Sequence, residues 1–234
     1  MRGSDMGAPS HLQIAIDGPA ASGKTTVAHA LAERLKILYL DTGAMYRTLA
    51  YLALQTRTDA DNEGALVRLW ENSGVQIALD GGAPLGFRIF AGQRELDERT
   101  LQSNEVTAIV STIAAHARVR EALVRTQRRI ASDGSVVMCG RDIGTVVLPL
   151  AQVKIFLTAS VQARVERRRT QLEAAGVDVN AHRLAQEIEE RDRLDRDRAA
   201  SPLVPAPDSH VVDSSALSAE QVVDEIVQIV ERSP

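Results

Sequence analysis

Short apolar segments recur along the chain, and most of them end at a glycine or an aspartate. Segments of this length, rich in β-branched residues and bounded by turn residues, predict buried strands. Five of them stand out, at residues 12–17, 37–40, 135–139, 153–157 and 210–213.

Between these segments, apolar residues recur at helical spacing. Ser218 and Gln221 have the spacing of a capping box ahead of the last of these helices. The alternation of strand, loop and helix predicts an α/β fold with a central five-stranded parallel sheet flanked by helices. The main predicted helices cover residues 24–36, 44–54, 105–131 and the stretch after Ser218.

One region breaks this pattern. Apolar and polar residues alternate over 75–79 and again over 87–89, with a turn rich in glycine and proline between them. A period of two on both sides of a turn predicts an antiparallel hairpin. We therefore predict a small antiparallel sheet inserted at residues 66–98, within a core made of residues 11–65 and 99–234.

The composition narrows the class of protein. The chain has 234 residues, of which 44% are hydrophobic and 25% charged, and its net charge is −4. These values predict a soluble globular protein and argue against a sequence-independent nucleic-acid binder, which needs a basic surface. The single cysteine excludes an internal disulfide and a cysteine-rich zinc site.

The N-terminus carries no sign of export. Residues 1–10 have no apolar core, so we expect a disordered leader outside the fold rather than a secretion signal. No apolar run approaches the ~18 residues of a membrane span. We therefore expect a cytoplasmic protein that does not bind membranes.

A phosphate-binding motif follows the first predicted strand. Residues 18–25 read GPAASGKT, which fits G-x-x-x-x-G-K-[ST] at every fixed position. Such a loop turns backbone N–H groups toward phosphate oxygens, and the helix that follows adds its positive end. Lys24 can reach the β- and γ-phosphates, and the Thr25 hydroxyl can hold Mg²⁺. The motif predicts nucleoside-triphosphate binding without choosing among kinase, GTPase and motor.

The remainder of the chain favours a kinase for a small acceptor. Switch GTPases read guanine with an Asn-Lys-x-Asp loop, and the sequence contains no Asn-Lys pair. Motor and large ATPase domains usually need a longer chain. No nucleophilic triad is evident, and the five histidines lack metal-ligand spacing.

Three polar clusters follow predicted strands or lie late in the chain, at residues 41–47, 140–144 and 191–198. Ligands of open α/β sheets bind beyond the carboxyl ends of the strands, and arginines there suit phosphate. Arg47 and Arg141 could instead form surface salt bridges. Asp142 could cap a helix or assist a magnesium ion.

Residues 164–198 are densely charged but balanced, with nine arginines and nine acids. Three pairs at i,i+4 spacing, Glu187–Arg191, Glu189–Arg193 and Asp192–Arg196, favour an exposed, self-paired helix. The run from Arg167 to Arg169 also suits a mobile lid, at about residues 164–190, that closes over phosphates.

Taken in order, several motifs resemble bacterial cytidylate kinases of the nucleoside-monophosphate kinase group. The carriers are IDGPAASGKTT, LDTGAMYR, VREAL, GRDIGTVV, VKIFL, ERDRLDRDR and SPLVPA. The resemblance covers nearly all of the chain after residue 11 and implies a P-loop kinase fold with a helical lid. Two departures show: Thr25-Thr26 stands where the family often has glycine after the lysine, and Thr42 where it often has serine.

The resemblance also implies roles for individual residues. ATP would bind Gly18, Pro19, Ala20, Ala21, Ser22, Gly23, Lys24, Thr25 and Thr26. CMP would bind Thr42, Tyr46, Arg47, Arg120, Arg141, Asp142, Arg191, Asp195 and Arg198. Lys24, Arg167 and Arg168 would act on the migrating phosphoryl group, and Thr25 or Thr26 would meet Mg²⁺.

The implied reaction transfers a phosphoryl group from ATP to CMP or dCMP. The implied partners are these small molecules and Mg²⁺, and nothing in the sequence requires more than a monomer. Three alternatives stay open at this point: a kinase for another monophosphate, an ATP-binding sensor with little turnover, and an α/β protein with a fortuitous glycine loop.

Overall fold

The computed structural model describes residues 11–80, 86–174, 176–198 and 200–233, so the predicted leader at residues 1–10 lies outside the described residues. A parallel sheet has the strand order β2-β6-β1-β7-β8, which confirms the predicted five-stranded sheet. Its strands are β1 (Gln13–Asp17), β2 (Leu38–Asp41), β6 (Val136–Gly140), β7 (Val153–Thr158) and β8 (His210–Asp213).

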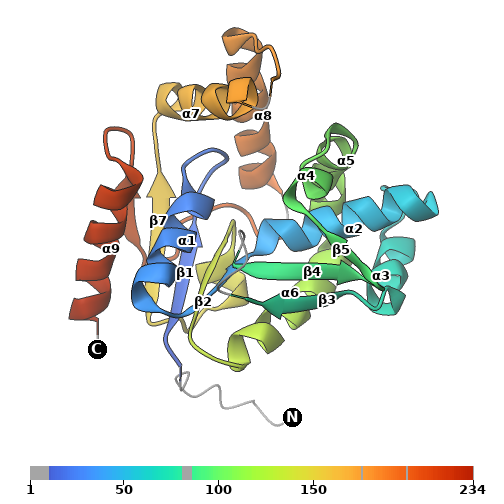
Figure 1. The fold of residues 1–234 in the computed structure, drawn as a ribbon, viewed down its shortest axis with the longest axis horizontal. Coiled ribbons are helices and arrows are strands. Elements are labelled where there is room, and N and C mark those ends of the chain that lie inside the picture. Colours follow the sequence, from blue (N-terminus) through green and yellow to red (C-terminus); the bar gives the residue numbers. More distant parts are fainter. Residues whose placement is uncertain (1–10, 81–85, 175, 199, 234) are drawn as a thin grey trace.

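The register of the sheet brings the carboxyl ends of its central strands together. Asp17 of β1 lies beside Gly140 of β6, and Asp41 of β2 lies beside Cys139. The loops that leave the sheet here therefore meet at one edge. Two helices, α7 (Val161–Ala174) and α8 (Ala181–Asp197), lie beyond that edge, at the top of Figure 1.

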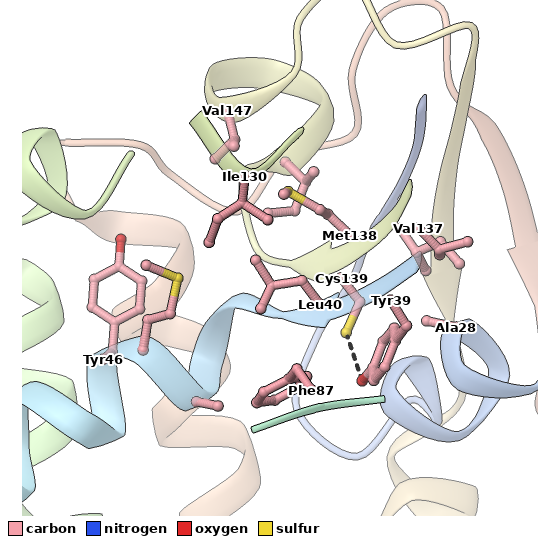
Figure 2. Packing of buried hydrophobic residues seen from close by; sticks show 14 of the residues in the cluster. Ala28, Tyr39, Leu40, Tyr46, Phe87, Ile130, Val137, Met138, Cys139 and Val147 are labelled. Carbon is pink, nitrogen blue, oxygen red and sulfur yellow. Dashed lines mark hydrogen bonds between the residues drawn. The ribbon is translucent and has the colours of Figure 1, made fainter. Parts of the chain in front are cut away.

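The core lies on both faces of the central strands, and every residue of β6 is buried. Figure 2 shows part of it, with the Tyr39 hydroxyl 3.6 Å from the Cys139 sulfur. Two helices, α1 (Lys24–Leu35) and α9 (Ala219–Arg232), pack against each other and against the sheet. The predicted capping box of Ser218 and Gln221 begins α9. Among the described residues, no helix has the length and apolar character needed to cross a membrane.

The prediction of one helix over residues 105–131 is wrong. The chain forms α5 (Asn104–Ala115) and α6 (Ala117–Ser132), and His116 between them has extended backbone, with φ −72° and ψ 122°. Its ring N–H donates to the carbonyl of Ala60, with 2.8 Å between nitrogen and oxygen. The break is tertiary in origin, since α5 packs on α2 (Thr42–Thr56) while α6 packs on α3 (Glu63–Asn72).

The predicted hairpin is confirmed, but the small sheet has a third strand that was not predicted. Its strands are β3 (Gln76–Leu79), β4 (Phe87–Ala91) and β5 (Arg94–Leu96), and α4 (Glu98–Leu101) follows. In β5 only Leu96 is apolar, so its residues show no alternation of apolar and polar side chains from which a strand could be predicted. The strand is fixed by pairing with β4, where Glu95 meets Arg88 across the strands. The insertion boundaries at residues 66 and 98 stay predictions.

Candidate functional site

The loop between β1 and α1 requires particular residues. A Cβ on Gly18 would lie 2.0 Å from the carbonyl oxygen of Leu157, so the loop can pass β7 only as glycine. Ala21 and Gly23 have φ values of 57° and 92°, in the left-handed region. Backbone of this kind favours N–H groups that turn toward an anion, and α1 begins directly after it. The motif therefore stands between strand and helix, as anion binding requires.

Lys24 is held inside this loop. Only 7% of the residue is exposed, and Nζ donates to the carbonyl of Pro19 at 2.6 Å and to the Ser22 hydroxyl at 3.3 Å. Burial, followed by the nearby charge of Arg141, holds the pKa of Lys24 well below its usual value. An anion in the loop would favour the charged form of this amine.

Four arginines gather near the same edge of the sheet: Arg47 of α2, Arg141 after β6, Arg168 of α7 and Arg191 of α8. Arg47 and Arg191 each lie within the electrostatic influence of Arg141 and Arg168. Burial, followed by repulsion from Arg141, lowers the pKa of Arg191 to about 10. We call these four residues the arginine cluster. Guanidinium groups crowded in this way suit a phosphate ligand, which accepts paired N–H bonds.

A buried ion pair lies next to the arginine cluster. Arg120 of α6 and Asp142 form an ion pair of 2.6 Å, and the side chain of each is only 5% exposed. The Arg120 guanidinium lies over the ring of Tyr46, 5.2 Å from its centre. Asp142 makes no side-chain cap on the π-helical turn η1 (Ile143–Val147) that follows it, so the helix-cap interpretation is wrong. We call Arg120, Asp142 and Tyr46 the paired pocket.

Thr42 and Asp195 border these two groups. The Thr42 hydroxyl donates to the carbonyl of Cys139 at 2.9 Å, at the end of β6. Arg141 pairs with Asp195 at 2.8 Å, and Arg198 lies 3.6 Å from the other oxygen of that carboxylate. Burial opposes the charge of Asp195, but the neighbouring arginines outweigh it and lower its pKa. Arg141 thus forms a partly buried ion pair within the candidate site.

The two predicted lid arginines have different surroundings. Arg167 donates to the backbone carbonyl of Ser22 in the phosphate loop at 3.2 Å and to the Ser214 hydroxyl at 3.0 Å. Arg168, one residue later, donates to Gln171 on its own helix at 3.4 Å, and its charge repels those of Arg47 and Arg191. Arg47, from α2, donates to the carbonyl of Leu101 and to the hydroxyl of Thr107.

Known proteins are similar in sequence to this chain over almost its whole length. A family model described as cytidylate kinase matches residues 14–232. This chain belongs to the cytidylate kinase family. A cytidylate kinase of Geobacillus sp. (strain WCH70) is 46% identical over 221 residues, covering 94% of this chain and 97% of that protein. One from Bacillus cereus is 45% identical over 219 residues, with 94% and 96% covered.

A solved structure supports the fold independently. An uncharacterized protein from Eubacterium ventriosum shares 12% sequence identity and superposes with a TM-score of 0.53, covering 95% of this chain and 99% of that one. Identity at that level bears on the fold alone.

Among the described residues of α8, none of the three predicted pairs, Glu187–Arg191, Glu189–Arg193 and Asp192–Arg196, forms, so that prediction is wrong. Asp192 departs furthest from it. This carboxylate pairs with Arg164 of α7 at 2.5 Å rather than with Arg196, and both partners are buried. Arg193 pairs with Glu190 and Asp197, while Glu187 pairs with Arg183. No sequence signal identified the Arg164–Asp192 contact, because the two residues lie on different helices.

Asp17 is a further residue that the sequence analysis read only as part of a turn. Its two carboxylate oxygens accept the backbone N–H groups of Ile143 and Gly144, each at 2.7 Å. Burial raises the pKa of Asp17 to about 6. The residue joins the phosphate loop to the segment that carries Arg141 and Asp142. The sequence feature that could have identified Asp17 is its position at the end of β1, where ligands of such sheets bind.

Proposed function

We propose that this chain transfers the γ-phosphoryl group of ATP directly, in line, to CMP and dCMP, giving CDP and dCDP. One observation carries the proposal: two sites suited to anions, the phosphate loop with Lys24 and the arginine cluster, face the same edge of the sheet. A donor triphosphate and an acceptor monophosphate need such adjoining sites. Membership of the cytidylate kinase family supports cytosine as the base.

On the donor side, residues 18–26 would bind ATP. The backbone N–H groups of the loop would hold the phosphates, and Lys24 would reach the β- and γ-phosphates. Lys24 lies at the base of this loop with its amine already within it. ATP would thus restore a favourable environment to a cation whose burial disfavours its charge.

On the acceptor side, the paired pocket would hold the base. The Asp142 carboxylate accepts hydrogen bonds, so it would accept from the exocyclic amine of cytosine, and Thr42 would lie near the same amine. Uracil has a carbonyl there, and two facing acceptors cost ~1–3 kcal/mol. Arg120 would contact the cytosine from the other side of the pair, and Tyr46 would frame the nucleoside.

The arginine cluster would hold the acceptor phosphate. Arg47 and Arg141 would bind its oxygens, with Arg198 beside them. Arg191 would frame the nucleoside at the same end. Asp195 already orients Arg141 at 2.8 Å, and its other oxygen, 3.6 Å from Arg198, would reach the sugar hydroxyls.

The transfer needs no catalytic base. The acceptor is a phosphate whose second pKa is about 6, so at neutral pH it is largely a dianion. The remaining problem is to bring two anions into line. Lys24, Arg167 and Arg168 would neutralise the migrating group, and closure of a lid at about residues 164–190 would exclude water that would otherwise hydrolyse ATP.

The residues at the start of α1 fit a magnesium ion. The Thr25 hydroxyl lies 3.2 Å from Oδ2 of Asp41, so two oxygen ligands of the kind Mg²⁺ prefers stand side by side next to the loop. Thr25 would hold the ion, with Thr26 as the neighbouring hydroxyl. The ion supplies charge neutralisation of the β- and γ-phosphate oxygens when bound.

The experiment that tests this function measures ADP release from ATP and Mg²⁺ with CMP, dCMP, UMP, AMP and GMP in parallel. We expect strong turnover with CMP and dCMP and at least about tenfold less with UMP. Asp142→Ala should narrow the ratio of CMP to UMP turnover, whereas Asp133→Ala, an exposed aspartate at the end of α6, should leave it unchanged.

Two results would contradict the proposal. Turnover with another acceptor only would keep a kinase and discard the cytosine pocket. ATP binding without acceptor-dependent ADP release would favour a nucleotide sensor. The cytoplasmic location, the monomeric state and the lack of nucleic-acid or membrane partners stay predictions, and analytical ultracentrifugation would test the monomer.

A further inference from the structure

Arg164 and Asp192 form a buried ion pair between α7 and α8. The two residues are 5% and 3% exposed, and Nη1 of Arg164 lies 2.5 Å from Oδ2 of Asp192. Neither residue belongs to the ATP or CMP sets proposed above. A buried ion pair stabilises a fold little, because desolvating both charges offsets their attraction. Stability alone therefore does not explain why this ion pair is buried here.

Both members of the pair also bind the phosphate loop. The same Nη1 of Arg164 donates to the carbonyl of Ala20 at 3.2 Å, while the N–H of Ala20 donates to Oδ1 of Asp192 at 3.3 Å. Arg164, Asp192 and Ala20 thus form a closed ring of hydrogen bonds, with a separate carboxylate oxygen for each donor. The ring fixes both polar groups of one loop residue.

A second arginine of α7 repeats this contact. Arg167 lies one turn after Arg164 on the same face of the helix, and it donates to the carbonyl of Ser22. The two side chains therefore hold alternate carbonyls of the loop, those of Ala20 and Ser22. Loop carbonyls held from α7 leave the neighbouring N–H groups, such as those near Gly23, free to face a phosphate.

Consecutive residues of α8 serve the two sides of the site. Arg191 belongs to the arginine cluster, and Asp192, the next residue, holds the phosphate loop. We propose that Arg164 and Asp192 are positioning residues that set the shape of the phosphate loop for ATP, so that the loop is correctly formed only when α7 and α8 are docked on it. This inference rests on the proposed ATP site.

The test compares Asp192→Asn with Asp197→Asn. Both remove one negative charge from α8, but Asp197 is exposed and pairs only with Arg193, at 3.6 Å, among the contacts described. We expect Asp192→Asn to raise the KM for ATP by about tenfold or more, since it weakens a charge-assisted bond to Arg164. The KM for CMP should stay within about twofold, and Asp197→Asn should change neither constant.

A merely structural pair would give a different result. Equal increases in both KM values, or an unchanged KM for ATP in a folded Asp192→Asn protein, would overturn the inference. If Asp192→Asn does not fold, Arg164→Lys keeps the charge and decides by the same comparison of the two KM values, with Arg169→Lys on the exposed face of α7 as its control. Loss of CMP turnover in the unaltered protein would instead contradict the proposed function.

Discussion

At the paired pocket, the Arg120 guanidinium and the Asp142 carboxylate lie 2.6 Å apart and are buried together. At the arginine cluster, burial and then repulsion from Arg141, Arg47 and Arg168 lower the pKa of Arg191 to about 10, while Asp195 acts in the opposite direction. The pocket residues are buried, whereas the cluster arginines are partly buried, and in the cluster Asp195 pairs with Arg141. The comparison teaches that the charges of the paired pocket are balanced by the protein while the Tyr46 hydroxyl and Arg120 Nε stay without hydrogen-bond partners among the described residues, whereas the arginine cluster is arranged for an anion from outside.

The largest effect is expected when the buried Asp142 loses its partner Arg120. Arg120→Met should lower the free energy of unfolding by about 3–5 kcal/mol, because Asp142 would keep its desolvation cost and lose its partner. Urea unfolding measures the change. Arg125→Met is the matched control, since Arg125 lies on the same helix and makes an exposed pair with Glu71. A loss as small as the control's would show that the pair is not buried in solution.

The next largest effect concerns Lys24, which shares the electrostatic character of the arginine cluster. Lys24→Met should reduce kcat/KM by about 10³-fold, because the charge nearest the phosphates would be gone. Stability should fall little, since the lysine is disfavoured by burial and by Arg141. Steady-state kinetics and thermal unfolding separate the two effects, with Lys36→Met, at the exposed end of α1, as the control. Equal activity in both variants would remove Lys24 from the mechanism.

A pH titration sharpens the comparison at Asp17, a buried carboxyl beside the phosphate loop whose pKa rises to about 6. A raised pKa means that the folded protein binds this proton more tightly than the unfolded chain does. Asp17 therefore favours the folded state below about pH 4, and this contribution, roughly 3 kcal/mol, is lost as the pH rises through 6. The difference in unfolding free energy between the unaltered protein and Asp17→Asn should change over that range.

Several charged groups act on Asp17 in that titration. Asp142 raises its pKa and Lys24 lowers it, while the backbone N–H groups of Ile143 and Gly144 also lower it. Asp61→Asn, at an exposed site outside these contacts, is the control measured over the same pH range. A flat difference for Asp17→Asn would mean that this carboxyl titrates as an exposed aspartate does.

The smallest change in unfolding free energy is expected at Arg191, in contrast with Arg120. Arg191→Met should leave the unfolding free energy unchanged or raise it by up to about 1 kcal/mol, because a partly buried cation that other cations repel is removed. Arg193→Met, an exposed neighbour paired with Glu190, should change it by less than about 0.5 kcal/mol. Destabilisation by Arg191→Met comparable to that of Arg120→Met would mean that the arginine cluster is as well paired as the pocket.

The sequence predicted the donor loop more completely than the acceptor site because the loop is local. Residues 18–25 are contiguous, and the spacing of their glycines and lysine is typical of the backbone geometry that binds phosphate. The five strands were equally predictable, since each is a short apolar segment bounded by turns. The acceptor roles came only from resemblance to a family, because Arg120, Asp142 and Asp195 are brought together by the fold.

Tertiary contacts explain what the sequence did not predict. The break at His116 depends on the carbonyl of Ala60, and β5 depends on pairing with β4. Asp192 has the spacing to pair with Arg196 but faces Arg164, whose guanidinium is buried beside it. Periodicity records which face of an element is buried and carries no information on which partner lies there.

The central claim is that the protein balances the charges of the paired pocket, whereas the arginine cluster is arranged for a phosphate. It is tested most directly by calorimetric titration of CMP and cytidine into the unaltered protein and Arg47→Met. The account predicts that CMP binds more tightly than cytidine, and that Arg47→Met weakens CMP by about tenfold or more while leaving cytidine unchanged. Equal affinity for CMP and cytidine, or an equal loss for both in the variant, would contradict it.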